Sequence, residues 1–482
     1  MRIFGLQLAV FCLVITASVA DEIESFWDEY VTLIETLDKY GYGDPSPIDE
    51  LNRNSSKIPV DAKFHCEPSV SPVKPTSVNK LRPGDFNVVA ALGDSLTAAN
   101  GAGAKTLIGV AIEYRGLSAP IGGDQDISSV ITVPNILKAY NRYIYGYSTG
   151  TGGVDNPRSR LNVAKPGAIA EDMPGQARKL IERMRSDAFV DIDHDWKLVT
   201  LFIGGNDLCR QCKNPERFSP ENYVANVEEA IQILSEIPRM FVNVVGILEA
   251  WRVAEIKGFV CDVLHQVLCP CGMSASGRTM MKKATEQYQT LLQDSINSGK
   301  FDRDDFAAVF QPFFLDTLLP RHPDGTPDLS FFAPDCFHFS QKAHGAQAIA
   351  TWNNMIKPVG SKDRSWTPGE NVRCPSEDFP YFYTNMNSKP SWKNPGNEDQ
   401  DQDQDQSDQQ QNPDQNQGQQ PNKPPAGDEG GLAGGVVALI VVSVLVLLGG
   451  VSYLVYRQKT GSKRFYQQIQ GEGAQAVHES VF

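Results

Sequence analysis

The amino-acid sequence predicts an α/β fold built on a parallel β-sheet. Five short apolar runs, rich in β-branched and aromatic residues, alternate along the chain with longer stretches of helical periodicity. Strands that alternate with helices pair in parallel, because each helix carries the chain back across the sheet in a right-handed crossover. The five expected strands are Phe86–Leu92, Leu161–Ala164, Leu198–Ile203, Phe241–Ile247 and Phe306–Phe310.

Stretches of helical periodicity lie between and after these runs. The expected helices are Pro174–Arg185, Pro220–Glu236, Ser276–Ser298 and Gln341–Met355. A further amphipathic helix is predicted at Asp21–Tyr40, where seven apolar side chains follow one helical stripe, and we expect it to pack on the main fold. In open parallel sheets a ligand binds at the carboxyl ends of the strands, so functional residues are expected there.

Composition separates one large folded region from its flanking segments. The chain has 482 residues, of which 41% are hydrophobic and 21% charged, as is typical of a globular protein. Residues 21–85 are predicted to form a helical and proline-rich extension, and residues 86–393 a single domain that ends in a C-terminal wrap. The formal net charge is −14. Because an acidic fold repels phosphate backbones, nucleic acid is not an expected partner.

Residues 1–20 have the pattern of a secretory signal peptide. Arg2 precedes an apolar run, and the small residues Ser18 and Ala20 occupy the two positions that a signal peptidase reads. Cleavage is therefore expected before Asp21. The alternative is an uncleaved membrane anchor, which the short run and its small residues disfavour.

Residues 432–456 are predicted to form one transmembrane helix. At 1.5 Å per residue, the apolar run Val436–Tyr456 reaches about 31 Å, the thickness of a bilayer's hydrocarbon core. Four basic residues follow at once, which predicts a cytoplasmic tail over residues 457–482 and an extracellular fold. A removable glycolipid-anchor signal is the alternative, but such a signal would end with the apolar run.

Two polar segments flank this predicted helix. Residues 394–430 hold nine acids and one lysine but no Val, Ile, Leu or aromatic residue, so we expect a disordered stalk between the fold and the membrane. The chain ends in Ser480-Val481-Phe482, which places a hydroxyl residue two positions before an apolar terminal carboxylate. That arrangement suits the groove of a PDZ domain, and the alternative is a terminus that no partner reads.

Eight cysteines remain once the signal peptide, with Cys12, is removed. An even number in an oxidising compartment predicts disulfide bonds, although the sequence leaves the pairing open. The close spacing within two cysteine pairs could instead suggest zinc, but no neighbouring histidine pair or second CxxC completes four ligands. The disulfide candidates are Cys66, Cys209, Cys212, Cys261, Cys269, Cys271, Cys336 and Cys374. Asn54 lies in the only N-glycosylation sequon.

The first predicted strand ends in Gly93-Asp94-Ser95-Leu96, so Ser95 stands where a buried strand reaches the surface. A serine hydroxyl is a weak nucleophile until an adjacent base takes its proton, and that base needs an acid to orient it. Four residues alone carry little information, since a serine at this place can simply cap the following helix.

Polar groups at the ends of other strands favour a catalytic role for Ser95 over a capping role. Asn206, in the sequence GGND after the third predicted strand, can donate to an oxyanion that forms near Ser95, although GGND can also be only a tight turn. Gly167, after the second strand, offers a backbone N–H to the same oxyanion. Asp335 and His338 follow the fifth strand at a spacing of three, so the carboxylate can hold one imidazole nitrogen while the other faces Ser95. A packing or helix-start histidine is the alternative.

Together and in this order, these motifs resemble the GDSL, or SGNH, hydrolase family. The resemblance implies that Ser95 is the nucleophile, His338 the base and Asp335 the acid, and that Gly167 and Asn206 join the Ser95 amide in an oxyanion hole. It also implies a three-layer α/β sandwich of flavodoxin-like type around a five-stranded parallel sheet.

A wider similarity covers roughly Cys66 to Cys374. The segments FNVVAALGDSLTAANGAGA and PDLSFFAPDCFHFSQKAHGAQAIATWNNM look like the membrane-associated phospholipase B branch of the family. Animal members of that branch can carry several tandem catalytic repeats, whereas this sequence contains one. The branch implies an enzyme that hydrolyses phospholipids and lysophospholipids. Together with the predicted signal peptide and transmembrane helix, this gives a single-pass type I protein of the plasma membrane. A serine triad needs no cofactor or metal.

Two other functions remain open at this stage. Within enzymes, the rival is an esterase of acetylated glycans or small esters; outside enzymes, it is a catalytically silent, stalked receptor or adhesion protein. Among the other histidines, a metal site at His194 beside Asp191 is conceivable, but a solvated loop is favoured. His265, His322 and His344 have no ligand spacing.

Overall fold

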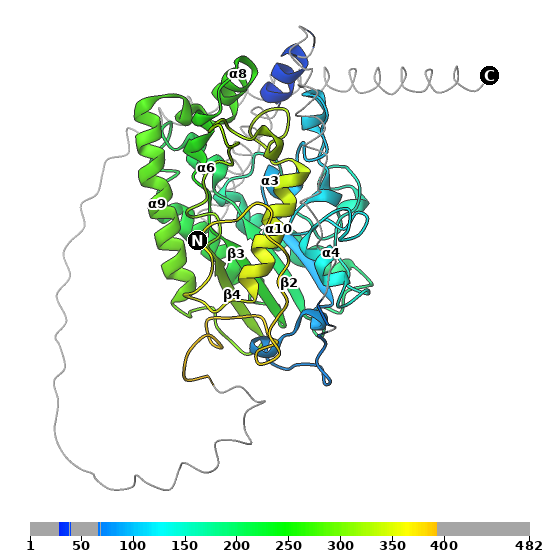
Figure 1. Ribbon diagram of the computed structural model, residues 1–482. Coiled ribbons are helices and arrows are strands. Elements are labelled where there is room, and N and C mark those ends of the chain that lie inside the picture. Colours follow the sequence, from blue (N-terminus) through cyan, green and yellow to red (C-terminus); the bar gives the residue numbers. More distant parts are fainter. Residues whose placement is uncertain (1–27, 38, 40–65, 68, 393–482) are drawn as a thin grey trace, which may run out of the picture. The chain divides into compact units, whose positions relative to one another are not determined.

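The computed structural model describes residues 28–37, 39, 66, 67 and 69–392 (Figure 1). The predicted signal peptide, the sequon at Asn54, the stalk, the transmembrane segment and the tail all lie outside these residues. Within the described part of the chain, no helix is both long and apolar enough to cross a membrane.

The described residues form one parallel sheet of four strands. These are β1 (Val88–Gly93), β2 (Lys197–Phe202), β3 (Met240–Val245) and β4 (Phe306–Gln311), paired in sequence order. Every strand residue is buried, which explains why these runs are almost continuously apolar. Gly93 lies beside Phe202, and Phe202 beside Val245, so the strands end level with one another. The prediction of an α/β fold with a parallel sheet is confirmed.

The second predicted strand, at Leu161–Ala164, is not part of the sheet that the described residues form, so the prediction of five strands is wrong to that extent. Ala91 of β1 exchanges two backbone hydrogen bonds with this segment, at 3.0 and 3.1 Å. Val89, however, bonds to Tyr145 instead, so two separate segments share the free edge of β1. The next β1 amide on this edge, that of Gly93, donates to the side chain of Gln176 rather than to the segment.

Helices cover both faces of the sheet and give the fold three layers. One face carries α5 (Met173–Ser186), α7 (Pro220–Leu234) and α9 (Ala275–Asn297), and the other carries α4 (Val133–Lys138) and α10 (Gln341–Met355). Side chains of β1 alternate between the two cores: Val88 and Ala90 face one, Val89 and Ala91 the other. Figure 1 shows α10 crossing in front of the strands.

The four helices predicted in the domain all begin within one residue of the expected position. Serine caps explain this agreement: Ser219, Ser274 and Ser340 each accept a hydrogen bond from a backbone N–H in the first turn of α7, α9 and α10. Another helix, α8 (Phe259–Leu268), was not predicted.

The N-terminal helix, residues 28–37, packs on the domain as expected. Tyr30, Ile34 and Leu37 are buried and share an apolar cluster with Leu264 and Leu268 of α8. The helix is drawn in dark blue beside α8 in Figure 1.

All eight candidate cysteines form disulfide bonds. The pairs are Cys66–Cys374, Cys209–Cys269, Cys212–Cys271 and Cys261–Cys336. The sulfur atoms considered for zinc are therefore bonded to one another. The pair Cys66–Cys374 joins the segment before β1 to the segment after α10. In the C-terminal wrap, Phe382 is buried against Phe86 and Trp352.

Candidate active site

Ser95 lies where β1 turns into the short helix α3 (Ser95–Ala98). Glycine is required at position 93, because a Cβ there would come within 2.5 Å of a carbonyl oxygen of β2. The side chain of Asp94, rather than that of Ser95, caps α3 by accepting a hydrogen bond from the Leu96 amide at 2.9 Å. The neighbour thus fills the capping role that was the alternative for Ser95, and Ser95 lines a pocket.

Asp335 and His338 form a buried hydrogen bond in the loop before α10. Nδ1 of His338 lies 2.5 Å from Oδ2 of Asp335, and the two side chains are 1% and 0% exposed. Oδ1 of Asp335 accepts the backbone N–H groups of Phe337 and His338. Burial alone would raise the pKa of Asp335, but His338 and the hydrogen bonds to the carboxylate hold it at about 2. Asp335 is therefore an ionised acceptor that can orient the imidazole.

The pocket connects the loop of His338 with the end of β1. Ser95 lines it, and so do Phe337 and Phe339, the two neighbours of His338. Burial raises the pKa of Asp94 to about 6, against the opposing effects of the Leu96 amide and of the charge on His338. The predicted base thus lies between two residues that line the same pocket as the predicted nucleophile.

Asn206 lies in the first turn of α6 (Gly205–Arg210), directly after β2, and lines the same pocket as Ser95. Its Nδ2 donates to the carbonyl oxygen of Ala168 at 2.9 Å. An amide nitrogen carries a second N–H, which can serve a ligand in the pocket. The bond to Ala168 also fixes the loop that contains Gly167, whose φ of 76° favours glycine. Gly167 itself does not line the pocket.

Two further residues, which sequence reasoning missed, hold this loop. Both carboxylate oxygens of Asp207 lie within 3.1 Å of the Ala170 amide, and burial raises the pKa of Asp207 to about 7. The buried guanidinium of Arg115 donates to the carbonyl oxygens of Asn162 and Ala164 at 3.0 and 2.7 Å. Asp207 belongs to the GGND motif, which drew attention only to Asn206, and Arg115 belongs to no motif noted in the sequence.

The pocket is lined mainly by apolar side chains. Leu248, Val253, Ile256, Phe314 and Trp366 contribute to its walls. Three ionisable side chains line it as well: Glu249 and Arg252 are bonded to each other at 2.5 Å, and Asp94 caps α3. Such a lining suits an apolar chain more than a sugar.

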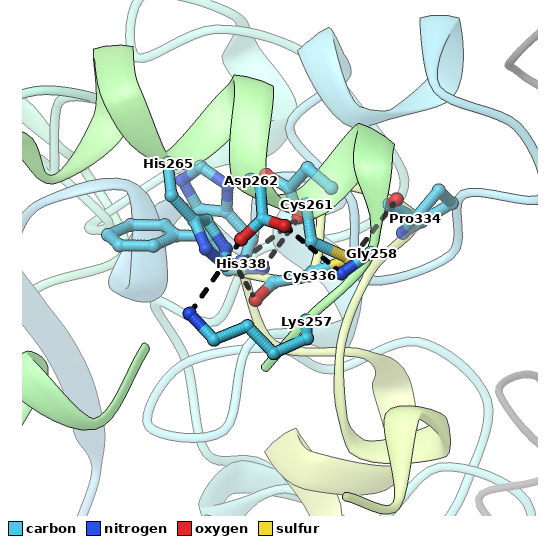
Figure 2. Close-up of a disulfide and its surroundings, with 10 residues drawn as sticks. Lys257, Gly258, Cys261, Asp262, His265, Pro334, Cys336 and His338 are labelled. Carbon is cyan, nitrogen blue, oxygen red and sulfur yellow. Dashed lines mark hydrogen bonds and ion pairs between the residues drawn. A yellow bond between two sulfur atoms is a disulfide. The ribbon is translucent and has the colours of Figure 1, made fainter. Parts of the chain in front are cut away.

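A disulfide fixes the loop that carries the Asp335–His338 pair (Figure 2). Cys336 lies between these two residues and is bonded to Cys261 of α8. His265, also on α8, places its Nε2 3.2 Å from the carbonyl oxygen of Cys336. The loop is thereby joined to α8 at two points.

Tyr30 contacts the Asp335–His338 pair, which the sequence did not predict. Its hydroxyl donates to Oδ2 of Asp335 at 2.5 Å. The periodic stripe of the N-terminal helix predicted only that Tyr30 would be buried, which it is.

The remaining histidines lie apart from this arrangement or serve packing. His194 is exposed and lies 3.0 Å from Asp191. His322 is also at the surface, and burial lowers the pKa of His344 to about 3. No group of three or more His, Cys, Asp or Glu side chains in the described ranges is placed to hold a metal ion.

Curated relatives are similar to much of the described domain. "Phospholipase B1, membrane-associated" of Mus musculus is 44% identical over 329 residues, which cover 65% of this chain and 22% of the relative. The Homo sapiens protein of that name is 46% identical over 325 residues, again 65% and 22% of the two chains. The Rattus norvegicus protein is 42% identical over 343 residues, 68% and 24%. The chain thus spans less than a quarter of the length of these relatives.

A solved structure and a family profile also match. The crystal structure of phospholipase A1 from Streptomyces albidoflavus NA297 is 17% identical with a TM-score of 0.26, over 56% of this chain and 98% of that chain. The family described as GDSL-like Lipase/Acylhydrolase matches residues 89–351, which are more than half of the chain and include Ser95, Gly167, Asn206, Asp335 and His338. The chain therefore belongs to the GDSL-like lipase/acylhydrolase family.

Proposed function

We propose that this protein hydrolyses fatty acyl esters of phospholipids and lysophospholipids with Ser95, His338 and Asp335 as its catalytic triad. The observation that carries the proposal is the buried hydrogen bond between Asp335 and His338 beside an apolar pocket that Ser95 and Asn206 line. The printed name of the mammalian relatives, phospholipase B1, supports a phospholipid as the substrate.

In the proposed reaction Ser95 attacks the ester carbonyl while Nε2 of His338 takes its proton. Asp335, ionised and bound to Nδ1, stabilises the imidazolium that forms. The negative charge on the carbonyl oxygen is stabilised by the amides of Ser95 and Gly167 and by Nδ2 of Asn206. His338 then returns the proton to the leaving alcohol, and water hydrolyses the acyl-enzyme in the same way.

Product analysis tests the substrate class. Purified full-length protein in mixed micelles is given phosphatidylcholine with different acyl chains at its two positions, lysophosphatidylcholine, or an acetylated sugar. We expect free fatty acid from both lipids and little acetate from the sugar, because the pocket walls are apolar. Acetate as the main product would favour the glycan esterase, and no hydrolysis at all would favour a silent receptor. A Ser95→Ala protein from the same preparation controls for contaminating lipases.

Loss of the disulfide between Cys261 and Cys336 is expected to lower kcat by about 10- to 100-fold, because a small displacement of the base is enough to impair catalysis. The measurement compares kcat of the Cys261→Ser/Cys336→Ser variant with that of Cys66→Ser/Cys374→Ser. The second pair lies away from the triad loop, so its loss should affect thermal stability more than kcat. A chelator should leave the kcat of both variants unchanged. Equal kcat in wild type and in the Cys261/Cys336 variant contradicts this role.

The same proposal includes a place at the cell surface. Four disulfide bonds support an oxidising, extracellular compartment for the domain, and the relatives are named membrane-associated. A signal peptide at residues 1–20 and a single span at residues 432–456 would give a type I protein.

The proposed cytoplasmic tail, residues 457–482, is expected to bind a PDZ domain through its last residues. A peptide that ends in Ser480-Val481-Phe482 should bind, and the same peptide without Phe482 should not. Equal binding of the two peptides excludes a PDZ domain as the partner.

A further inference from the structure

The hydroxyl of Tyr30 contacts the same carboxylate oxygen that receives His338. Oδ2 of Asp335 accepts a hydrogen bond from Tyr30 at 2.5 Å and lies 2.5 Å from Nδ1 of His338. Oδ1 accepts two backbone N–H groups, from Phe337 and His338. Tyr30 lies 305 positions from Asp335 in the sequence and comes from a helix outside the four-stranded core. The carboxylate is thus held from its own loop and from the N-terminal helix.

Apolar packing fixes the position of this hydroxyl. Ile34 and Leu37, one and two turns after Tyr30, are buried with it against Leu264 and Leu268 of α8. The tyrosine ring also lies 6.2 Å from the His338 ring, measured between centroids. Because α8 is joined to the triad loop by the disulfide described above, the helix, α8 and the loop form one connected unit.

We propose that Tyr30 is a positioning residue of the triad, whose hydroxyl holds Oδ2 of Asp335 in the orientation that receives Nδ1 of His338. This inference deepens the proposed hydrolase function and rests on it. The N-terminal helix is then a part of the catalytic unit rather than an accessory of the domain.

The hydrogen bond from Tyr30 also changes how strongly the Asp335 carboxylate attracts the His338 ring. Burial, together with Asp335, raises the pKa of Tyr30 well above its usual range, so the phenol remains a donor. A donor on Oδ2 withdraws negative charge from the carboxylate and weakens its hold on an imidazolium. Without the hydroxyl, the carboxylate holds the imidazolium more strongly.

Other titratable groups act on this pair from neighbouring elements and stay the same in a Tyr30 variant. His265 of α8 interacts electrostatically with Asp335. Asp94, at the start of α3, and His344 of α10 interact with His338. A difference between wild type and a Tyr30 variant therefore isolates the hydroxyl.

The test compares full-length Tyr30→Phe with Tyr145→Phe. Both substitutions keep the ring and delete a hydroxyl that donates to an aspartate, since Tyr145 bonds to Oδ2 of Asp187 at 2.9 Å. Tyr145 lies beside Val88, at the opposite end of β1 from Ser95. We expect Tyr30→Phe to lower kcat about tenfold with little change in KM, and to move the acid limb of the pH–rate profile to higher pH. Tyr145→Phe should do neither.

Rates are expressed per competent site, counted with a phosphonate that labels Ser95. If Tyr30→Phe lowers the fraction of labelled protein but leaves kcat per labelled site and the pH profile unchanged, Tyr30 has a structural role and the proposal is overturned. Unchanged values throughout overturn it as well.

A second readout does not depend on turnover. The Nδ1–H proton of His338, bound to a carboxylate, should give a far-downfield proton NMR resonance at low pH. We expect it to shift in Tyr30→Phe and to stay in place in Tyr145→Phe, and an unmoved resonance in Tyr30→Phe contradicts the proposal. If wild-type protein hydrolyses no ester, the proposed function fails, while this resonance still decides whether Tyr30 acts on the Asp335–His338 pair.

Discussion

Alanine at Ser95 or at His338 is expected to lower kcat for phospholipid hydrolysis by roughly 10⁴- to 10⁶-fold. Ser95→Ala removes the atom that bonds to the acyl group, and His338→Ala removes the base that takes and returns the proton. Because the members of a triad act as one unit, the double variant should be hardly worse than either single variant. Initial rates with lysophosphatidylcholine, from micromolar enzyme and long incubations, cover the required range.

Two matched controls separate catalysis from folding in this experiment. Ser118→Ala deletes another buried hydroxyl, which donates to the carbonyl oxygen of Thr97 in α3, and His194→Ala removes an exposed imidazole. Both should remain within a few-fold of wild type. More than a tenth of wild-type turnover in purified Ser95→Ala or His338→Ala would exclude the assigned triad.

Asn206→Ala is expected to lower kcat by roughly 10²- to 10³-fold, the usual effect of deleting one oxyanion donor. The substitution also removes the hydrogen bond to Ala168, which fixes the loop of Gly167. Both consequences act on the transition state more than on bound substrate, so KM should change little. Steady-state kinetics of the purified variant give both constants.

The control is Asn222→Ala, which deletes an exposed amide that donates to the carbonyl oxygen of Glu216. It should match wild type in kcat and KM. If Asn206→Ala raises KM and leaves kcat unchanged, Asn206 binds the substrate rather than the transition state.

Local signals explain what the sequence predicted correctly. The four described strands are buried on both faces, so each appears as a short apolar run between polar segments. Three of the four domain helices begin at a serine cap that is visible in the sequence. Since parallel strands end at one edge, residues that follow different strands, such as Ser95 and Asn206, were expected to share a pocket, and they do.

Two kinds of interaction explain what the sequence did not predict: competition between segments for the edge of β1, and contacts between residues far apart in the sequence. Leu161–Ala164 has the composition of a strand, but Tyr145 occupies part of the β1 edge that it would need. The helix α8 is rich in valine, a poor helix former, and its apolar side chains pack in one cluster with those of the N-terminal helix. The pairing of Cys261 with Cys336 and the contact of Tyr30 with Asp335 each join segments that only the folded chain brings together.

The bond between Cys66 and Cys374 bears on how the protein responds to proteolysis. The loop 321–326 is exposed along its whole length and contains Arg321, a site for trypsin-like proteases. A cut there places Ser95 and His338 on different fragments, yet this bond and the one between Cys261 and Cys336 both span the cut. The fragments stay at a high effective concentration and cannot diffuse apart. Nicked protein should therefore migrate as one band on a non-reducing gel and keep its activity until a reductant separates the two pieces.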